Sequence, residues 1–123
     1  MHRFKDLEIW KQSRILCTDI YNVTSTFPDA EKFGLTNQLR RAAVSIPSNI
    51  AEGAGRGSDK EFIHFLSIAK GSSFELETQL EIALQRNYLT LDKFQVLSSR
   101  NEYIQRMLTN FQKQLSQRNQ DKK

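Results

Sequence analysis

The chain has 123 residues, of which 38% are hydrophobic and 26% are charged, and its formal net charge is +4. This length suits one domain with its own core, and the composition excludes a disordered or collagen-like chain. A single cysteine excludes an internal disulfide, and no apolar run approaches the roughly 20 residues that span a bilayer. We therefore expect a cytoplasmic protein with no membrane partner.

The first helix is predicted over residues 6–26. Asp6 can cap this helix or favour its positive end, and Pro28 follows its last turn. Residues of one face recur at steps of three and four, as in a helix with one buried side. This predicted face contains Trp10, Ser13, Cys17, Ile20, Tyr21, Thr24 and Phe27.

The second helix is predicted over residues 33–54 and contains a proline inside its apolar stripe. Leu39, Ile46 and Ile50 keep one phase on both sides of Pro47. An internal proline removes a backbone hydrogen bond and clashes with the preceding turn, which costs about 3 kcal/mol or bends the helix. We expect one helix that is kinked at Pro47, with small residues that permit a close neighbour.

The third helix is predicted over residues 59–87, after a capping box formed by Ser58 and Glu61. Its main stripe consists of Phe62, Phe65, Leu66, Ala69, Ser73, Leu76, Leu80 and Ala83. Four more apolar residues fall outside this stripe, namely Ile63, Ile68, Phe74 and Ile82. A second apolar face is typical of a subunit contact, so we predict an oligomer interface at these four residues.

The fourth helix is predicted over residues 91–117. Its seam alternates steps of four and three residues and contains one polar member, Asn101, which usually sets the register of a helix pair. The seam residues are Leu97, Asn101, Ile104, Leu108, Phe111 and Leu115. Short connections between helices imply antiparallel neighbours. The predicted fold is a single all-α domain over residues 1–123, an antiparallel up-down-up-down four-helix bundle.

No catalytic constellation is evident in the sequence. His2 and His64 are the only histidines, neither with a second metal ligand at helical spacing, and Cys17 lies on an apolar helix face. We expect no enzyme activity, no catalytic or metal-binding residues, no cofactor and no small-molecule substrate. A helical ribonuclease is the enzyme alternative, but the arginine and histidine that it needs lie four to six residues apart, and Arg56 and His64 have seven residues between them.

Two basic groups are candidates for contact with phosphate. Arg40 and Arg41 lie on the second helix, and Arg56 and Lys60 flank the start of the third. A lysine or arginine beside a helix start can bind a phosphate of a nucleic acid. The alternative is that these residues pack against another subunit.

With these residues in place, the chain resembles the 23S ribosomal-RNA intervening-sequence proteins, a bacterial family of small four-helix bundles. The resemblance runs from FKDLEIWK at Phe4–Lys11, through the block FGLTNQLRRAAVSIPSNIAEGAGRGSDKEF that begins at Phe33, to about Leu89. The family is similar to the accessory proteins of diversity-generating retroelements, basic pentameric barrels that contact nucleic acid. The resemblance implies a homo-oligomer, with five subunits, and a nucleic-acid partner; it supplies no catalytic residue.

The resulting hypothesis is a non-enzymatic, homo-oligomeric bundle that binds RNA or DNA through Arg40, Arg41, Arg56 and Lys60. A charge of +4 per subunit gives 5 × 4 = +20 in a pentamer, which strengthens attraction to phosphate. The alternative is a protein-interaction adaptor or scaffold without nucleic-acid binding, which docks its partner on the extra apolar residues of the third helix or on the face around Arg41.

Overall fold

The computed structural model describes residues 2–121, which fold into four α-helices and two short 3₁₀ helices, with no strand among them. The elements are η1 (Phe4–Asp6), α1 (Glu8–Thr24), η2 (Asp29–Glu31), α2 (Leu35–Ala54), α3 (Asp59–Gln85) and α4 (Leu91–Asp121). The predicted all-α fold class is therefore confirmed. Within residues 2–121, no helix combines the length and the apolar character that a membrane span needs.

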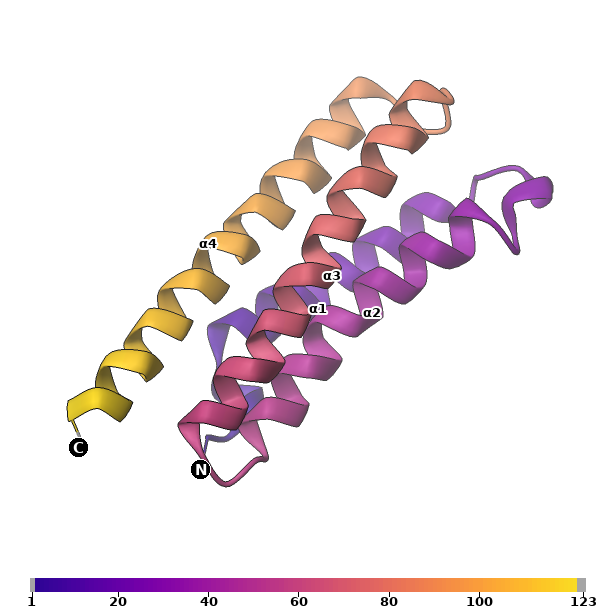
Figure 1. The fold of residues 1–123 in the computed structure, drawn as a ribbon. Helices are drawn as coiled ribbons and strands as arrows, with labels where there is room; N and C mark the ends of the chain where they lie inside the picture. The colour runs from indigo at the N-terminus through magenta and orange to yellow at the C-terminus, as the bar shows by residue number, and fades with distance from the viewer. Residues whose placement is uncertain (1, 122–123) are drawn as a thin grey trace.

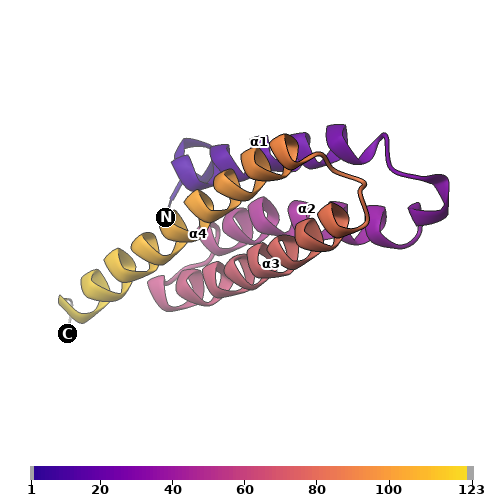
Figure 2. The ribbon, with the colours of Figure 1, turned by 90° about the horizontal axis from the view of Figure 1, so that it is seen from above.

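Successive helices run in opposite directions, and both chain ends lie at the same end of the bundle (Figure 1). α2 packs against α1 and α3, while α4 packs against α3 and α1, so the packing closes around the four helices. At the opposite end, the connection between α1 and α2 projects beyond the connection between α3 and α4 (Figure 2). This projecting connection carries η2 and leads directly into α2.

The start of α1 differs from the prediction because Asp6 does not cap it. Asp6 belongs to η1, and α1 begins at Glu8 after Leu7, whose backbone is extended and whose side chain offers no cap. The Asp6 carboxylate instead lies 3.6 Å from Nε of Arg3, in an exposed ion pair.

The buried face of α1 is rotated relative to the predicted one. Ile9 and Leu16, which the prediction omitted, are 5% and 1% exposed, whereas Tyr21 is 43% exposed. The two hydroxyl residues of the predicted face are buried as expected: Ser13 donates to the Trp10 carbonyl at 3.0 Å, and Thr24 to the Ile20 carbonyl at 2.7 Å. Because these hydroxyls are satisfied by their own helix, they are tolerated among apolar neighbours.

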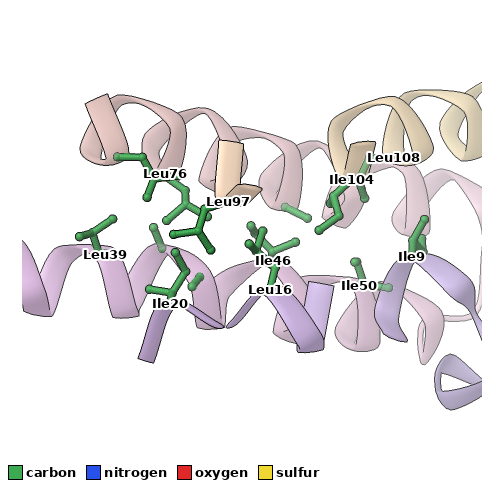
Figure 3. Close-up of a cluster of buried hydrophobic side chains, with 14 of the residues drawn as sticks. Ile9, Leu16, Ile20, Leu39, Ile46, Ile50, Leu76, Leu97, Ile104 and Leu108 are labelled. Atoms are coloured by element: carbon green, nitrogen blue, oxygen red, sulfur yellow. The ribbon is translucent and has the colours of Figure 1, made fainter. Parts of the chain in front are cut away.

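All four helices contribute to one hydrophobic core (Figure 3). Isoleucine and leucine side chains of α1 and α2 meet those of α3 and α4; the labelled ones are Ile9, Leu16, Ile20, Leu39, Ile46, Ile50, Leu76, Leu97, Ile104 and Leu108. The predicted stripes of α2, α3 and α4 are confirmed as core, although Phe65 and Phe111 are only half-buried. α2 runs without interruption through Pro47, and a kink there stays a prediction.

α2 and α3 approach each other through small residues. The Ser45 and Ser72 hydroxyls are hydrogen-bonded across the interface at 2.8 Å. One end of this interface has room only for glycine, since a Cβ on Gly53 would lie 2.8 Å from Cδ1 of Phe62 and 2.8 Å from Cβ of Phe65. Small side chains thus set the separation of these two helices.

α3 and α4 are joined by a buried polar pair. The Ser73 hydroxyl donates to Oδ1 of Asn101 at 2.7 Å, and Nδ2 of Asn101 donates to the Ser73 carbonyl at 3.0 Å. Asn101 is 1% exposed and Ser73 is fully buried. The polar member of the predicted seam therefore has its partner on the facing helix.

Replacing Asn101 with alanine should destabilise the fold by about 1–3 kcal/mol, because the Ser73 hydroxyl is then buried without its acceptor. Urea denaturation of Asn101→Ala, Ser73→Ala and the double variant measures this effect. The double variant should lose less than the sum of the two single losses, since each change removes the same pair. Additive losses would show that the pair is not coupled.

Gly53→Ala should destabilise the protein by about 1–3 kcal/mol, because the added methyl group forces Phe62 or Phe65 to move. Gly71→Ala is the matched control: Gly71 is also helical and exposed, and its added Cβ meets no atom within 4 Å. This control should gain about 0.5–1 kcal/mol from the higher helix propensity of alanine. Equal effects on the thermal midpoint would contradict a close α2–α3 contact at Gly53.

Candidate nucleic-acid interface

The four predicted cations lie in two groups rather than in one patch. Arg40 and Arg41 are in the first half of α2, and Arg56 and Lys60 flank the turn between α2 and α3. Thirteen residues of helix separate Arg41 from the end of α2 at Ala54, a rise of roughly 20 Å. One subunit therefore presents these cations at two separate positions along its length.

Arg40 is engaged in packing between α1 and α2. Its Nε donates to the Thr24 hydroxyl at 2.9 Å, and its Nη2 donates to the Tyr21 carbonyl at 3.4 Å. The guanidinium also lies over the Tyr21 ring, 4.7 Å from its centroid. These contacts support the interpretation of Arg40 as a residue that holds α1 to α2, with its charge near the surface.

At the α2–α3 turn, one cation is paired and the other faces solvent. Nη2 of Arg56 lies 2.6 Å from the Glu52 carboxylate, and its guanidinium covers the Phe65 ring at 4.9 Å. Lys60 is exposed in the first turn of α3, where the Ser58 hydroxyl accepts from the Glu61 backbone N–H at 3.2 Å. The predicted cap at Ser58 is confirmed.

Arg41 is exposed and stands where two open grooves meet. One groove, of about 680 Å³, lies between α2 and α3 and is lined by residues that include Phe33, Gln38 and Glu75; the other, of about 590 Å³, lies between α1 and α2 and includes Tyr21. Asn37, Arg41 and Ser45 line both. We call the polar part of α2 here the Arg41 surface, which consists of Asn37, Gln38, Arg41, Ser45 and Ser48.

The Arg41 surface is rich in hydrogen-bonding groups and poor in opposing charge. Among the described residues, no ion pair joins Arg41 to an acid. Glu75, on the α3 rim of the larger groove, is the acidic side chain of its lining. The surface thus presents one uncompensated guanidinium among amides and hydroxyls, a combination that binds phosphate oxygens and other polar acceptors.

Phe33 lies at the end of the larger groove and is 87% exposed, more than any other exposed large hydrophobic residue in the described chain. Nζ of Lys32 is 5.6 Å from the centroid of its ring. Phe33 was not among the residues that the sequence pattern predicted for the surface. No helical phase marks it, because Phe33 precedes α2, which begins at Leu35.

Glu31 fixes the segment that carries Phe33. Its Oε1 accepts from the Leu35 backbone N–H at 3.2 Å, and its Oε2 accepts from the Tyr88 hydroxyl at 2.9 Å. The hydrogen bond from Leu35, followed by that from Tyr88, lowers the pKa of Glu31. Tyr88 is held after α3 because Asn87 has a left-handed backbone (φ 62°) and the Tyr88 N–H bonds the Ala83 carbonyl at 2.9 Å.

The predicted oligomer-interface residues of α3 do not share one face. Ile63 is half-buried against the core, and its carbonyl accepts from Nε2 of Gln112 on α4 at 3.2 Å. Ile68, Phe74 and Ile82 are 39%, 48% and 43% exposed. Helical spacing puts Ile68 and Ile82 on the side of Glu75, and Phe74 on the side of α4.

The histidines lie apart from the Arg41 surface. His64 is exposed beside the Phe65 ring, at 5.5 Å between centroids. His2 contacts the Phe62 and Phe111 rings, and burial, with the nearby Arg118 guanidinium, lowers its pKa. Within residues 2–121, no three histidine, cysteine or acidic side chains gather as a metal site would require.

Fold and surface together define a small four-helix-bundle protein whose polar grooves lie open on the outside of the bundle. The chain belongs to the 23S rRNA-intervening sequence protein family, whose model matches residues 5–110. The resemblance inferred from the sequence is thereby confirmed.

Among solved structures, the chain is similar to a protein of unknown function from the S23 ribosomal protein family of Bacteroides thetaiotaomicron VPI-5482. The two share 24% sequence identity with a TM-score of 0.77, over 85% of this chain and 98% of the other. This likeness supports the fold. No curated protein matches the chain.

The two hydrogen bonds that the Glu31 carboxylate accepts should make the stability of the fold depend on pH in the acidic range. Because the pKa of Glu31 is lower in the folded chain than its ordinary value of 4.5, the ionised form favours folding. This contribution is complete above about pH 4.5 and is lost as the pH falls through the folded pKa. Thermal midpoints of the unmodified protein and of Glu31→Gln should therefore differ at pH 7 and converge towards pH 3.

The matched control is Glu102→Gln, at an exposed position of α4. Its midpoint should follow that of the unmodified protein at every pH. If Glu31→Gln behaved in the same way, Glu31 would not clamp the start of α2.

Proposed function

We propose that this protein is a non-enzymatic, homo-oligomeric helical bundle that binds RNA or DNA, and that the Arg41 surface makes the principal contact. The observation that carries the proposal is the exposed Arg41 guanidinium, which lies between two open polar grooves and has no ion-pair partner among residues 2–121. A guanidinium in such a setting binds phosphate oxygens with two parallel hydrogen bonds.

Lys60 is the second contact in this proposal. It lies beyond the far end of α2 from Arg41 and is exposed beside the capped start of α3. The two positions are roughly 20 Å or more apart, a distance that several successive phosphates of one strand span. A nucleic acid that follows the α2–α3 edge of the bundle therefore meets both cations.

Self-association supports this role by multiplying weak sites. The exposed Ile68, Phe74 and Ile82 side chains offer apolar area for contacts between subunits. In a ring of five subunits, the pentamer that we infer from the family, symmetry places five Arg41 surfaces around one axis. Binding of one nucleic acid to several of them raises the overall affinity beyond that of a single site.

The alternative function is a protein-interaction adaptor or scaffold. The same three exposed apolar residues of α3 favour it, because they can dock another protein instead of a second copy. A pull-down from a bacterial lysate that enriches one protein, and that nuclease treatment leaves unchanged, would support the adaptor over the nucleic-acid reading.

Binding to a labelled RNA should weaken steeply with salt, as measured by fluorescence anisotropy between about 50 and 200 mM salt. Arg41→Glu combined with Lys60→Glu should reduce affinity at least tenfold at low salt and lower the slope of log K against log salt by about one per lost phosphate contact. Light scattering of the free protein measures the number of subunits.

The matched control reverses an exposed arginine on another helix, Arg106→Glu on α4, together with Lys113→Glu. This control variant has the same net charge as the Arg41→Glu, Lys60→Glu variant. It should bind the RNA more tightly than that variant. No binding at low salt with micromolar protein, or equal losses in both variants, would contradict the proposed interface.

A further inference from the structure

Phe33 has an unusual position for a large apolar side chain. It is 87% exposed, although burial of a phenylalanine side chain ordinarily stabilises a protein. The segment around it is fixed, because Glu31 before it binds the Leu35 N–H and the Tyr88 hydroxyl. The fold therefore holds this ring outward, at the rim of the larger groove.

The neighbours of Phe33 indicate which kind of ligand fits against the exposed ring. Lys32 places its ammonium group 5.6 Å from the ring centroid, and Arg41 lines the same groove, as do the amides of Asn37 and Gln38. A protein partner that buried Phe33 would need further apolar area inside the groove, whereas its other lining residues, apart from Ala42, are polar or charged. A stacking ring beside cations is the combination that binds unpaired nucleotides.

We propose that the larger groove binds a single-stranded segment of RNA or DNA, with one base stacked on Phe33 and a neighbouring phosphate on Arg41. This inference rests on the proposed function and specifies its ligand. In a duplex the bases are stacked inside the helix and cannot lie on a protein ring, so the ring contact is available only to unpaired bases. The amides of Asn37 and Gln38 then face the edges of these bases.

Two features of the groove sharpen the proposal. Glu31 and Tyr88 fix the Phe33 segment before binding, so less conformational entropy is lost when a base stacks on the ring. Glu75, on the α3 rim, faces the same strand and repels its phosphates. Removal of the Phe33 ring should therefore weaken binding through the loss of stacking, and removal of the Arg41 charge should weaken it through the loss of attraction. Neutralisation of Glu75 should strengthen binding.

The test measures anisotropy with a labelled single strand of about 12 nucleotides and with a hairpin duplex of the same length, at one fixed salt concentration. The unmodified protein should bind the single strand more tightly. Phe33→Ala should weaken binding of the single strand by roughly 5- to 100-fold and leave duplex binding unchanged. Tyr103→Ala, at an exposed aromatic residue of α4, is the matched control and should change neither.

Charge variants give an independent readout. Arg41→Ala should weaken binding of both ligands and lower the salt slope by about one, whereas Arg106→Ala should not. Glu75→Gln should strengthen binding of the single strand about two- to fivefold, because it removes one repulsive charge near the phosphates. Circular dichroism checks that each variant is folded.

The outcomes separate this inference from the function on which it rests. Absence of binding to either ligand overturns the proposed function. Equal affinity for strand and duplex, or an unchanged single-strand affinity of Phe33→Ala, overturns the inference and leaves nucleic-acid binding intact. If Phe33→Ala lowers the mass in light scattering while binding is unchanged, the ring belongs to a contact between two copies, and the inference fails.

Discussion

The close approach of α2 and α3 is the constraint on which the outer surface depends. At one level the two helices meet through hydrogen-bonded serine hydroxyls, Ser45 and Ser72, and at another through Gly53, where no Cβ fits beside Phe62 and Phe65. Because these two helices lie so close together, only an open groove remains between them. Longer side chains on their flanks, such as Arg41 and Glu75, then become its walls.

The same packing decides what each arginine can do. Arg40 and Arg41 are adjacent in the chain, yet 100° of helical rotation turns the first towards α1 and the second towards solvent. Arg40 donates hydrogen bonds to Thr24 and Tyr21, and the charge of Arg56 is compensated by Glu52. A count of basic residues therefore overstates the charge that is available to a ligand, and Arg41 and Lys60 are the members of the predicted set that remain uncompensated.

Much of the fold could be predicted from the sequence, because the apolar stripes of α2, α3 and α4 are long and regular. On α1 the prediction correctly placed the buried Ser13 and Thr24 on the core face, but it omitted Ile9 and Leu16 and included Tyr21, which is 43% exposed. Apolar residues occur on more than one side of α1, and a helical wheel does not reveal which side the other helices cover.

The site was harder to predict than the core. The sequence indicated Arg41 as one of four basic candidates. The groove beside it depends on the distance between two helices, and the residue pattern of a single helix does not contain that distance. The exposure of Phe33 was not predicted because it depends on the contact between Glu31 and Tyr88, which are 57 residues apart in sequence. The four predicted interface residues of α3 do not share one face, for a related reason. Ile63 lies under α4, and only the packed structure shows this.

The buried amide of α4 also limits how that helix can slide. In the antiparallel pair, Asn101 faces Ser73. A shift of α4 by one heptad would bring its amide opposite Leu66 or Leu80, side chains that offer neither donor nor acceptor and are fully buried. The displaced helix would keep its leucines covered and still be rejected, so one carboxamide distinguishes the native alignment from neighbours that hydrophobicity alone would accept.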